Sequence, residues 1–120
     1  MPTNIEGMVK QYSKIAILKP NKNFNILGGK LTITEVANCS FIPKRAIAFL
    51  TCKAKYGSYY IGIDSNKGYH NQVLVGNIRD YETHRCKCDI NNKNINIDFY
   101  TANPSVYDIP MILNEILLIG

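Results

Sequence analysis

The chain has 120 residues, of which 46% are hydrophobic and 19% are charged, and its formal net charge is +5. This length suits one domain with a buried core, and this hydrophobic content excludes a disordered chain. The lysines that supply most of the charge are scattered rather than clustered, so we expect them to face solvent or protect strand edges. A nucleic-acid partner is therefore not expected.

No apolar run reaches the roughly 18–20 residues of a membrane-spanning helix. The longest run, around residues 109–119, contains Pro110, Asn114 and Glu115. The first residues also lack the basic start and apolar stretch of a signal peptide. We expect synthesis in a cytoplasm without membrane insertion, where four cysteines are free thiols or metal ligands rather than disulfides.

An arm over residues 1–13 is expected to precede a single domain over residues 14–120, in which short apolar segments alternate with Gly, Asn, Asp and Pro clusters. Alternation of polar and apolar residues predicts half-buried strands, most clearly at 30–36 and 95–99. The predicted strands, in chain order, are 14–18, 24–27, 30–36, 45–52, 58–64, 69–75, 83–90, 95–99 and 109–119. Strands and turns of this kind are typical of a sandwich or barrel, and we expect an all-β, antiparallel, jelly-roll-like sandwich.

Turn residues separate the predicted strands. Residues 65–68 and 91–94 each predict a hairpin turn, because Asn and Gly tolerate positive φ. A corner is expected at residues 38–44, since Pro43 fixes its own φ and favours an extended Ile42.

The segment 109–119 is compatible with either a helix or a strand. As a helix it would carry one apolar stripe: Ile109, Ile112, Leu113, Ile116 and Leu117. As a strand it would place Met111, Leu113, Leu117 and Ile119 on one face and Ile112, Ile116 and Leu118 on the other. We favour a strand buried on both sides.

His84, Cys86 and Cys88 would share one face of a strand, and imidazole and thiolate both bind zinc. Successive ligands on a straight strand lie about 7 Å apart, however, which is too far for three of them to reach one ion. We favour Cys86 and Cys88 as small buried side chains facing Cys52 or other apolar residues, with no metal and no cofactor. A disulfide from Cys52 to either of them is a further alternative.

No catalytic residues are expected. The acidic residues are isolated along the chain, and no phosphate-binding loop or His-Glu-x-x-His motif occurs. A Cys–His nucleophile is disfavoured because nothing near His84 and Cys86 suggests an oxyanion hole. We therefore expect a protein that is not an enzyme.

Tyrosines crowd the middle third of the chain, among asparagines and Arg79. Tyrosine combines an apolar ring with a polar tip, and ring stacking with amide hydrogen bonds is a common way to hold a sugar. Binding residues concentrate on loops, whereas the other tyrosines are expected to pack within the sheets. The predicted ligand-binding residues are Tyr56, Tyr69, His70, Asn71, Arg79 and Tyr81.

The order of several short motifs resembles the C-terminal β-sandwich domains of tailed-phage tail fibres and related receptor-binding tips. The motifs are a Phe41-Ile42-Pro43-Lys44 corner before a buried strand, the paired tyrosines of 59–64, the 89–97 hairpin and the final Leu118-Ile119-Gly120. The resemblance spans residues 31–120. It implies a non-enzymatic subunit of the virion tail, commonly a homotrimer beside other tail proteins, that binds a host-surface glycan or protein.

Two other functions remain open from the residues alone. One is a small intracellular phage-encoded protein that inhibits a host factor through exposed tyrosines and lysines. The other is a metal-dependent protein that uses His84, Cys86 and Cys88.

Overall fold

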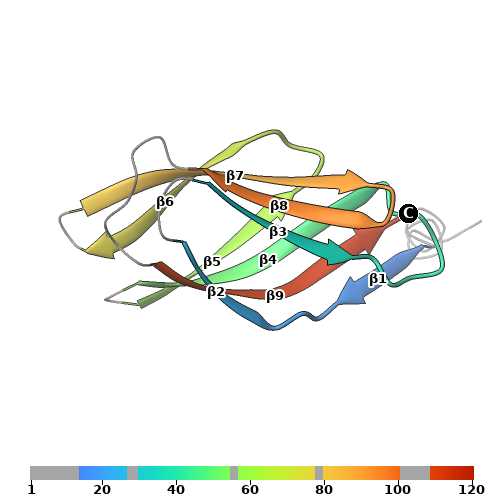
Figure 1. Ribbon diagram of the computed structural model, residues 1–120, viewed down its shortest axis with the longest axis horizontal. Helices are drawn as coiled ribbons and strands as arrows, with labels where there is room; N and C mark the ends of the chain where they lie inside the picture. Colours follow the sequence, from blue (N-terminus) through green and yellow to red (C-terminus); the bar gives the residue numbers. More distant parts are fainter. Residues whose placement is uncertain (1–13, 27–29, 55–56, 78–79, 101–108) are drawn as a thin grey trace, which may run out of the picture.

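The computed structural model describes residues 14–26, 30–54, 57–77, 80–100 and 109–120. These residues form nine strands and no helix, and every strand pairing is antiparallel. The strands make two sheets that face each other (Figure 1). The prediction of an all-β antiparallel sandwich is therefore confirmed, whereas the predicted arm over residues 1–13 lies outside the described residues.

Each sheet combines strands from both halves of the chain. The first has the order β1-β9-β4-β5, with β2 also paired to β9, and the second has the order β3-β8-β7-β6. The first sheet contains β1 (Ile15–Leu18), β2 (Lys22–Ile26), β4 (Arg45–Ala54), β5 (Gly57–Asp64) and β9 (Ile109–Ile119). The second contains β3 (Lys30–Val36), β6 (His70–Asn77), β7 (Asp80–Asn91) and β8 (Asn94–Tyr100).

The outer strands pair with strands that are distant in the sequence, whereas the inner strands pair with their sequence neighbours. β1 and β2 pair with β9, and β3 pairs with β8, so the two ends of the domain run side by side. β4 pairs with β5 and β6 pairs with β7 as sequence neighbours. The fold is thus jelly-roll-like in its outer pairs and built from local antiparallel pairs within.

The core lies between the sheets and is filled by alternate residues of each strand. Because strand side chains alternate between faces, the period-two pattern of the sequence sends one apolar set inward. From the first sheet the buried set includes Ala46, Ala48, Leu50, Cys52, Ile61, Ile63, Met111, Leu113, Ile116 and Leu118. From the second sheet it includes Ile33, Cys86, Cys88, Ile95, Ile97 and Phe99.

Strand β2 closes one side of the sandwich against the second sheet. The Phe24 ring packs on the buried Phe99 ring, with centroids 5.6 Å apart. Lys22 Nζ lies 2.5 Å from Glu35 Oε1 of β3, an ion pair between the sheets. That oxygen is buried without a hydrogen bond of ordinary geometry, so the ion pair is what offsets its burial.

The two predicted hairpin turns have different outcomes. Residues 91–94 do connect β7 to β8, with Asn91 opposite Asn94 and Asn92 at φ 58°. Residues 65–68 do not form a hairpin, because β5 pairs with β4 while β6 pairs with β7 in the other sheet. Turn residues mark a change of direction, but they do not specify which strand pairs with which.

The segment 109–119 is a strand, β9, so the helical alternative is wrong. Its predicted faces are also wrong beyond Asn114, because the register against β4 shifts between Phe49 and Leu50. This bulge places Ile116 and Leu118, rather than Leu117 and Ile119, in the core with Met111 and Leu113. The outer face of β9 is half-buried, so burial on both sides holds only in part.

The bulge in β9 lies opposite the break between β1 and β2. Leu18 pairs with Ile116 and Lys22 pairs with Leu113, so three residues of the edge face two of β9. Within the break, Pro20 lacks an N–H for the sheet and Asn21 has a φ of 46°. Asn114 is the extra residue of the bulge. Its Nδ2 donates to Thr51 Oγ1 at 2.7 Å, so its side-chain amide has a hydrogen-bond partner.

The predicted corner at 38–44 packs against the C-terminal residues. Lys44 N–H donates to the Ile119 carbonyl at 2.8 Å, and Gly120 N–H donates to the Lys14 carbonyl at 2.9 Å. A Cβ at Gly120 would lie 2.7 Å from Phe41 Cδ2, so only glycine fits this contact without a shift. Figure 1 shows the C-terminus beside the start of β1 and the segment leading into β4.

Candidate functional site

The outer surface of the second sheet is polar and is termed the polar face. Its side chains come from the residues that alternate with the core of β3, β8 and β7. The register aligns them in three rows across the sheet. The rows are Lys30–Tyr100–Arg85, Thr32–Asp98–Lys87 and Thr34–Asn96–Asp89.

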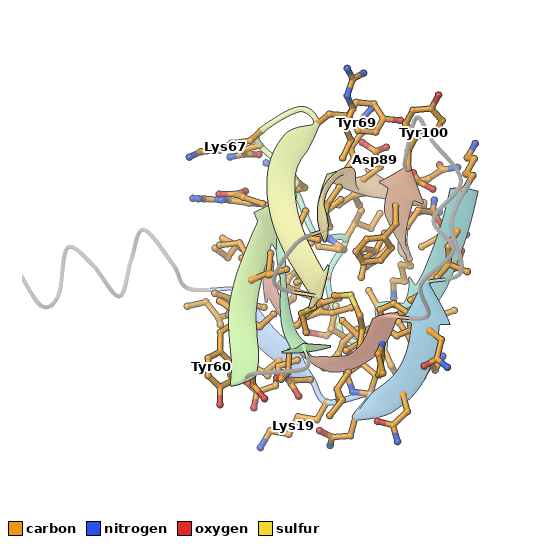
Figure 2. The ribbon with its side chains drawn as sticks, turned by 90° about the vertical axis from the view of Figure 1, so that its left-hand side faces the viewer. Lys19, Tyr60, Lys67, Tyr69, Asp89 and Tyr100 are labelled. Atoms are coloured by element: carbon orange, nitrogen blue, oxygen red, sulfur yellow. The ribbon has the colours of Figure 1, made fainter. Side chains whose placement is uncertain are left out.

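Two exposed tyrosines lie on the polar face. Tyr69, just before β6, is 56% exposed, and Tyr100, at the end of β8, is 43% exposed. Figure 2 shows both rings on the same side of the molecule as Asp89 and opposite Tyr60 of the first sheet. An open depression of about 410 Å³ lies between them, lined by Lys30, Tyr69, Arg85, Asp98, Phe99 and Tyr100.

Hydrogen bonds between strands hold the floor of this depression. Thr32 Oγ1 donates to Asp98 Oδ1 at 2.6 Å, and Thr34 Oγ1 donates to Asn96 Oδ1 at 2.7 Å. Among the described residues, no group donates to the second carboxylate oxygen of Asp98, so it is available as an acceptor. The polar groups are therefore oriented by a rigid sheet before any ligand arrives.

Positive charge surrounds the depression. Within the described part of the chain, Lys30 and Arg85 form no ion pair, and Lys87 makes a long contact of 3.4 Å with Asp89. Lys87 Nζ also lies 5.3 Å from the centroid of the Tyr69 ring, within cation–π range. The arrangement offers two ring faces, one carboxylate and two unpaired cations to a small polar ligand.

The structure places the sequence-predicted binding residues in different settings. Tyr69 lines the depression. His70 and Asn71 begin β6, and Tyr81 lies in β7, so their predicted loop positions are wrong. The Asn71 backbone pairs with Arg85 of the polar face, whereas Tyr81 pairs with Val75, four residues before Arg85 on β7. The remaining predictions, Tyr56 and Arg79, lie outside the described residues.

Five residues of the depression were not predicted as binding residues from the sequence: Lys30, Arg85, Asp98, Phe99 and Tyr100. Alternation in β8 does indicate that Asp98 and Tyr100 face away from Ile97 and Phe99. Their meeting with Lys30 and Arg85 depends on the β3–β8 and β7–β8 registers, which local patterns do not supply.

Cys86 and Cys88 of the candidate metal cluster are completely buried in the core. Burial raises the pKa of each thiol to about 12, with the nearby Cys52 contributing at Cys86 and Asp89 at Cys88. Burial also raises the pKa of Cys52. All four cysteines are free, and no group of three or more His, Cys, Asp or Glu among the described residues is arranged to hold a metal. The His84 side chain lies outside the described residues.

None of the described residues forms a helix long and apolar enough to cross a membrane. Comparisons with protein-family models, with curated proteins and with solved structures found no match to this chain.

Proposed function

We propose that this protein is a non-enzymatic binding module that recognises a glycan through the polar face. The observation that carries the proposal is the pair of exposed tyrosines, Tyr69 and Tyr100, beside Asp98 and Arg85 in one depression. Each group has a distinct part in sugar binding, and each is positioned by a strand or by the turn next to one.

The chemistry of the depression matches that of a sugar. The C–H face of a pyranose ring packs on an aromatic ring, and Tyr69 and Tyr100 offer such rings. Adjacent sugar hydroxyls donate to a carboxylate and accept from a guanidinium, which Asp98 and Arg85 supply. A volume of about 410 Å³ is within the usual range of small-ligand sites.

The rigidity of the site lowers the entropic cost of binding. Its side chains project from paired strands, and Thr32 orients Asp98. Little ordering is then required on binding, so most of the contact energy appears as affinity.

The resemblance to receptor-binding tips gives the proposed setting. In that setting the protein is a homo-oligomeric tail-fibre or baseplate-type subunit, beside other virion tail proteins, and its ligand is a glycan of the host surface. The polar face supports the binding part of this proposal and leaves the identity of the sugar open to experiment.

The test is a glycan array followed by calorimetry on the best-bound oligosaccharide, with single alanine variants. We expect Tyr69→Ala and Tyr100→Ala each to weaken binding by about 10-fold or more, as for aromatic anchors at interfaces. Ile42→Ala is the control, because Ile42 is 59% exposed at the 38–44 corner and belongs to neither sheet. Equal losses for all three variants, or no glycan binding at all, would contradict the proposal.

A further inference from the structure

The outer surface of the first sheet is unlike the polar face and is termed the apolar face. Its large side chains are hydrophobic and come from all four strands of the sheet order. They are Ile15 and Ile17 of β1, Leu117 and Ile119 of β9, Ile47 and Phe49 of β4, and Tyr60 of β5. Four of them remain well exposed: Ile15 at 49%, Ile17 at 53%, Phe49 at 41% and Tyr60 at 83%.

These side chains form one continuous surface. Ile17 pairs with Leu117, which pairs with Ile47, so three apolar residues form a row across three strands. Ile15 pairs with Ile119 in the next row. Phe49 pairs with Gly62 of β5, and its ring lies over this glycine, with Cε1 3.8 Å from where a Cβ would stand.

One pair of charged side chains beside the apolar face is formed within the chain. Arg45 Nε and Nη2 donate to Asp64 Oδ1 and Oδ2 at 3.1 and 2.5 Å, a two-point ion pair across β4 and β5. The hydrogen bond from Arg45 lowers the pKa of Asp64, which keeps the pair charged. Glu115, at the bulge, lies opposite Phe49 in the register and adds one exposed charge to this surface.

We propose that the apolar face is the surface through which two copies of this chain associate. A mainly apolar surface is complemented by another apolar surface, and an identical copy of the chain supplies one through two-fold symmetry. The four strands, about 4.8 Å apart and about 20 Å long here, present on the order of 400 Å² before side-chain relief is counted. Two such faces give on the order of 800 Å² of flat area, and the relief of the side chains raises the accessible surface that is buried to on the order of 1,000 Å², the size of a specific interface.

This association leaves the polar face free, because the two faces belong to opposite sheets of the sandwich. Each assembly then carries more than one copy of the glycan site, and linked weak sites gain avidity on a repetitive surface. The association itself does not depend on glycan binding. Failure of the two proposals is therefore distinguishable. Association is measured as molecular mass, whereas glycan binding is measured as affinity.

The test is light scattering coupled to size exclusion, on the full chain over a range of concentrations. We expect wild type to elute as a dimer, and Ile17→Lys and Phe49→Glu to elute as monomers. Val36→Lys is the matched control, because Val36 is 62% exposed on the edge strand β3 of the other sheet. It should keep the mass of wild type.

Circular dichroism and a thermal melt on each variant separate lost association from lost folding. Ile17 lies on the short strand β1 and is half exposed, so Ile17→Lys should remain folded even where Phe49→Glu does not. A wild-type chain that is monomeric at all concentrations overturns the proposal. An oligomer that persists in folded Ile17→Lys and Phe49→Glu also overturns it, because association would then use another surface.

Discussion

Lys87 Nζ lies 5.3 Å from the centroid of the Tyr69 ring, at the edge of the polar face. The contact joins β7 to the segment that precedes β6, and it favours this position of the Tyr69 ring. The positive charge thus holds one of the two aromatic surfaces in place for a ligand.

Replacing Lys87 by glutamine should therefore loosen Tyr69 and weaken glycan binding by about 2- to 5-fold, since an exposed cation–π contact contributes about 0.5–1 kcal/mol. Calorimetry with the glycan selected on the array measures this effect. Lys19→Gln is the control, because Lys19 lies on the far side of the molecule from the polar face (Figure 2). An equal loss for Lys19→Gln would point to general charge attraction instead.

Phe99→Ala tests the core beneath the site. Phe99 is 1% exposed and packs on Phe24, so its truncation should lower the free energy of unfolding by about 3–5 kcal/mol. Urea unfolding followed by circular dichroism measures the change. Tyr60→Ala, which removes an exposed ring, should cost far less. Similar losses for both variants would be inconsistent with the described core.

Gly120→Ala tests the contact between the C-terminal residue and the corner. The new Cβ would lie 2.7 Å from both Phe41 Cδ2 and Lys14 Cβ, so one of these segments must move. We expect a loss of about 1–3 kcal/mol, the usual cost of overpacking. Gly68→Ala is the control, because nothing lies within 4 Å of a Cβ there. Equal melting temperatures for wild type and Gly120→Ala would show that the contact is not formed.

The buried thiols predict a loss of stability at alkaline pH. Unfolded cysteines ionise above about pH 9, whereas Cys86 and Cys88 stay protonated in the fold until about pH 12. The unfolded state therefore binds fewer protons in this window, and stability falls as pH rises, by about 1.4 kcal/mol per pH unit for each thiol. Below about pH 9 the stability that the two buried thiols contribute is fully present.

Urea unfolding at several pH values between 8 and 11 tests this expectation. The double variant Cys86→Ala, Cys88→Ala should be less stable at pH 8 but should have a shallower decline with pH than wild type. Cys39→Ala is the control, since Cys39 is only half-buried near the corner. A double variant with the same slope as wild type would contradict buried, protonated thiols.

Strand positions follow closely from the sequence, because alternation and turn residues are local signals. The segment 30–36 matches β3 residue for residue, and Asn92 occupies the expected turn between β7 and β8. The sheet to which each strand belongs depends on contacts between distant residues. The turn residues at 65–68 therefore predicted a hairpin that does not form. The bulge in β9 likewise depends on the break in β1 and β2, nearly 100 residues earlier.

The candidate site was predictable only in part for the same reason. Tyr69 could be chosen as a turn-side aromatic residue, but Tyr100, Asp98 and Lys30 come from strands whose pairing joins distant parts of the chain. The apolar face could not be predicted from the sequence either. Its Ile17–Leu117–Ile47 row forms only when β9 lies between β1 and β4.

The central claim is that the polar face binds a glycan, and chemical-shift mapping tests it most directly. The oligosaccharide selected on the array is titrated into isotope-labelled protein while backbone amide resonances are followed. We predict the largest shifts at Arg85, Asp98 and Tyr100, and none at Phe49 or Gly62 of the apolar face. Largest shifts on the apolar face, or no shifts at saturating glycan, would contradict the account.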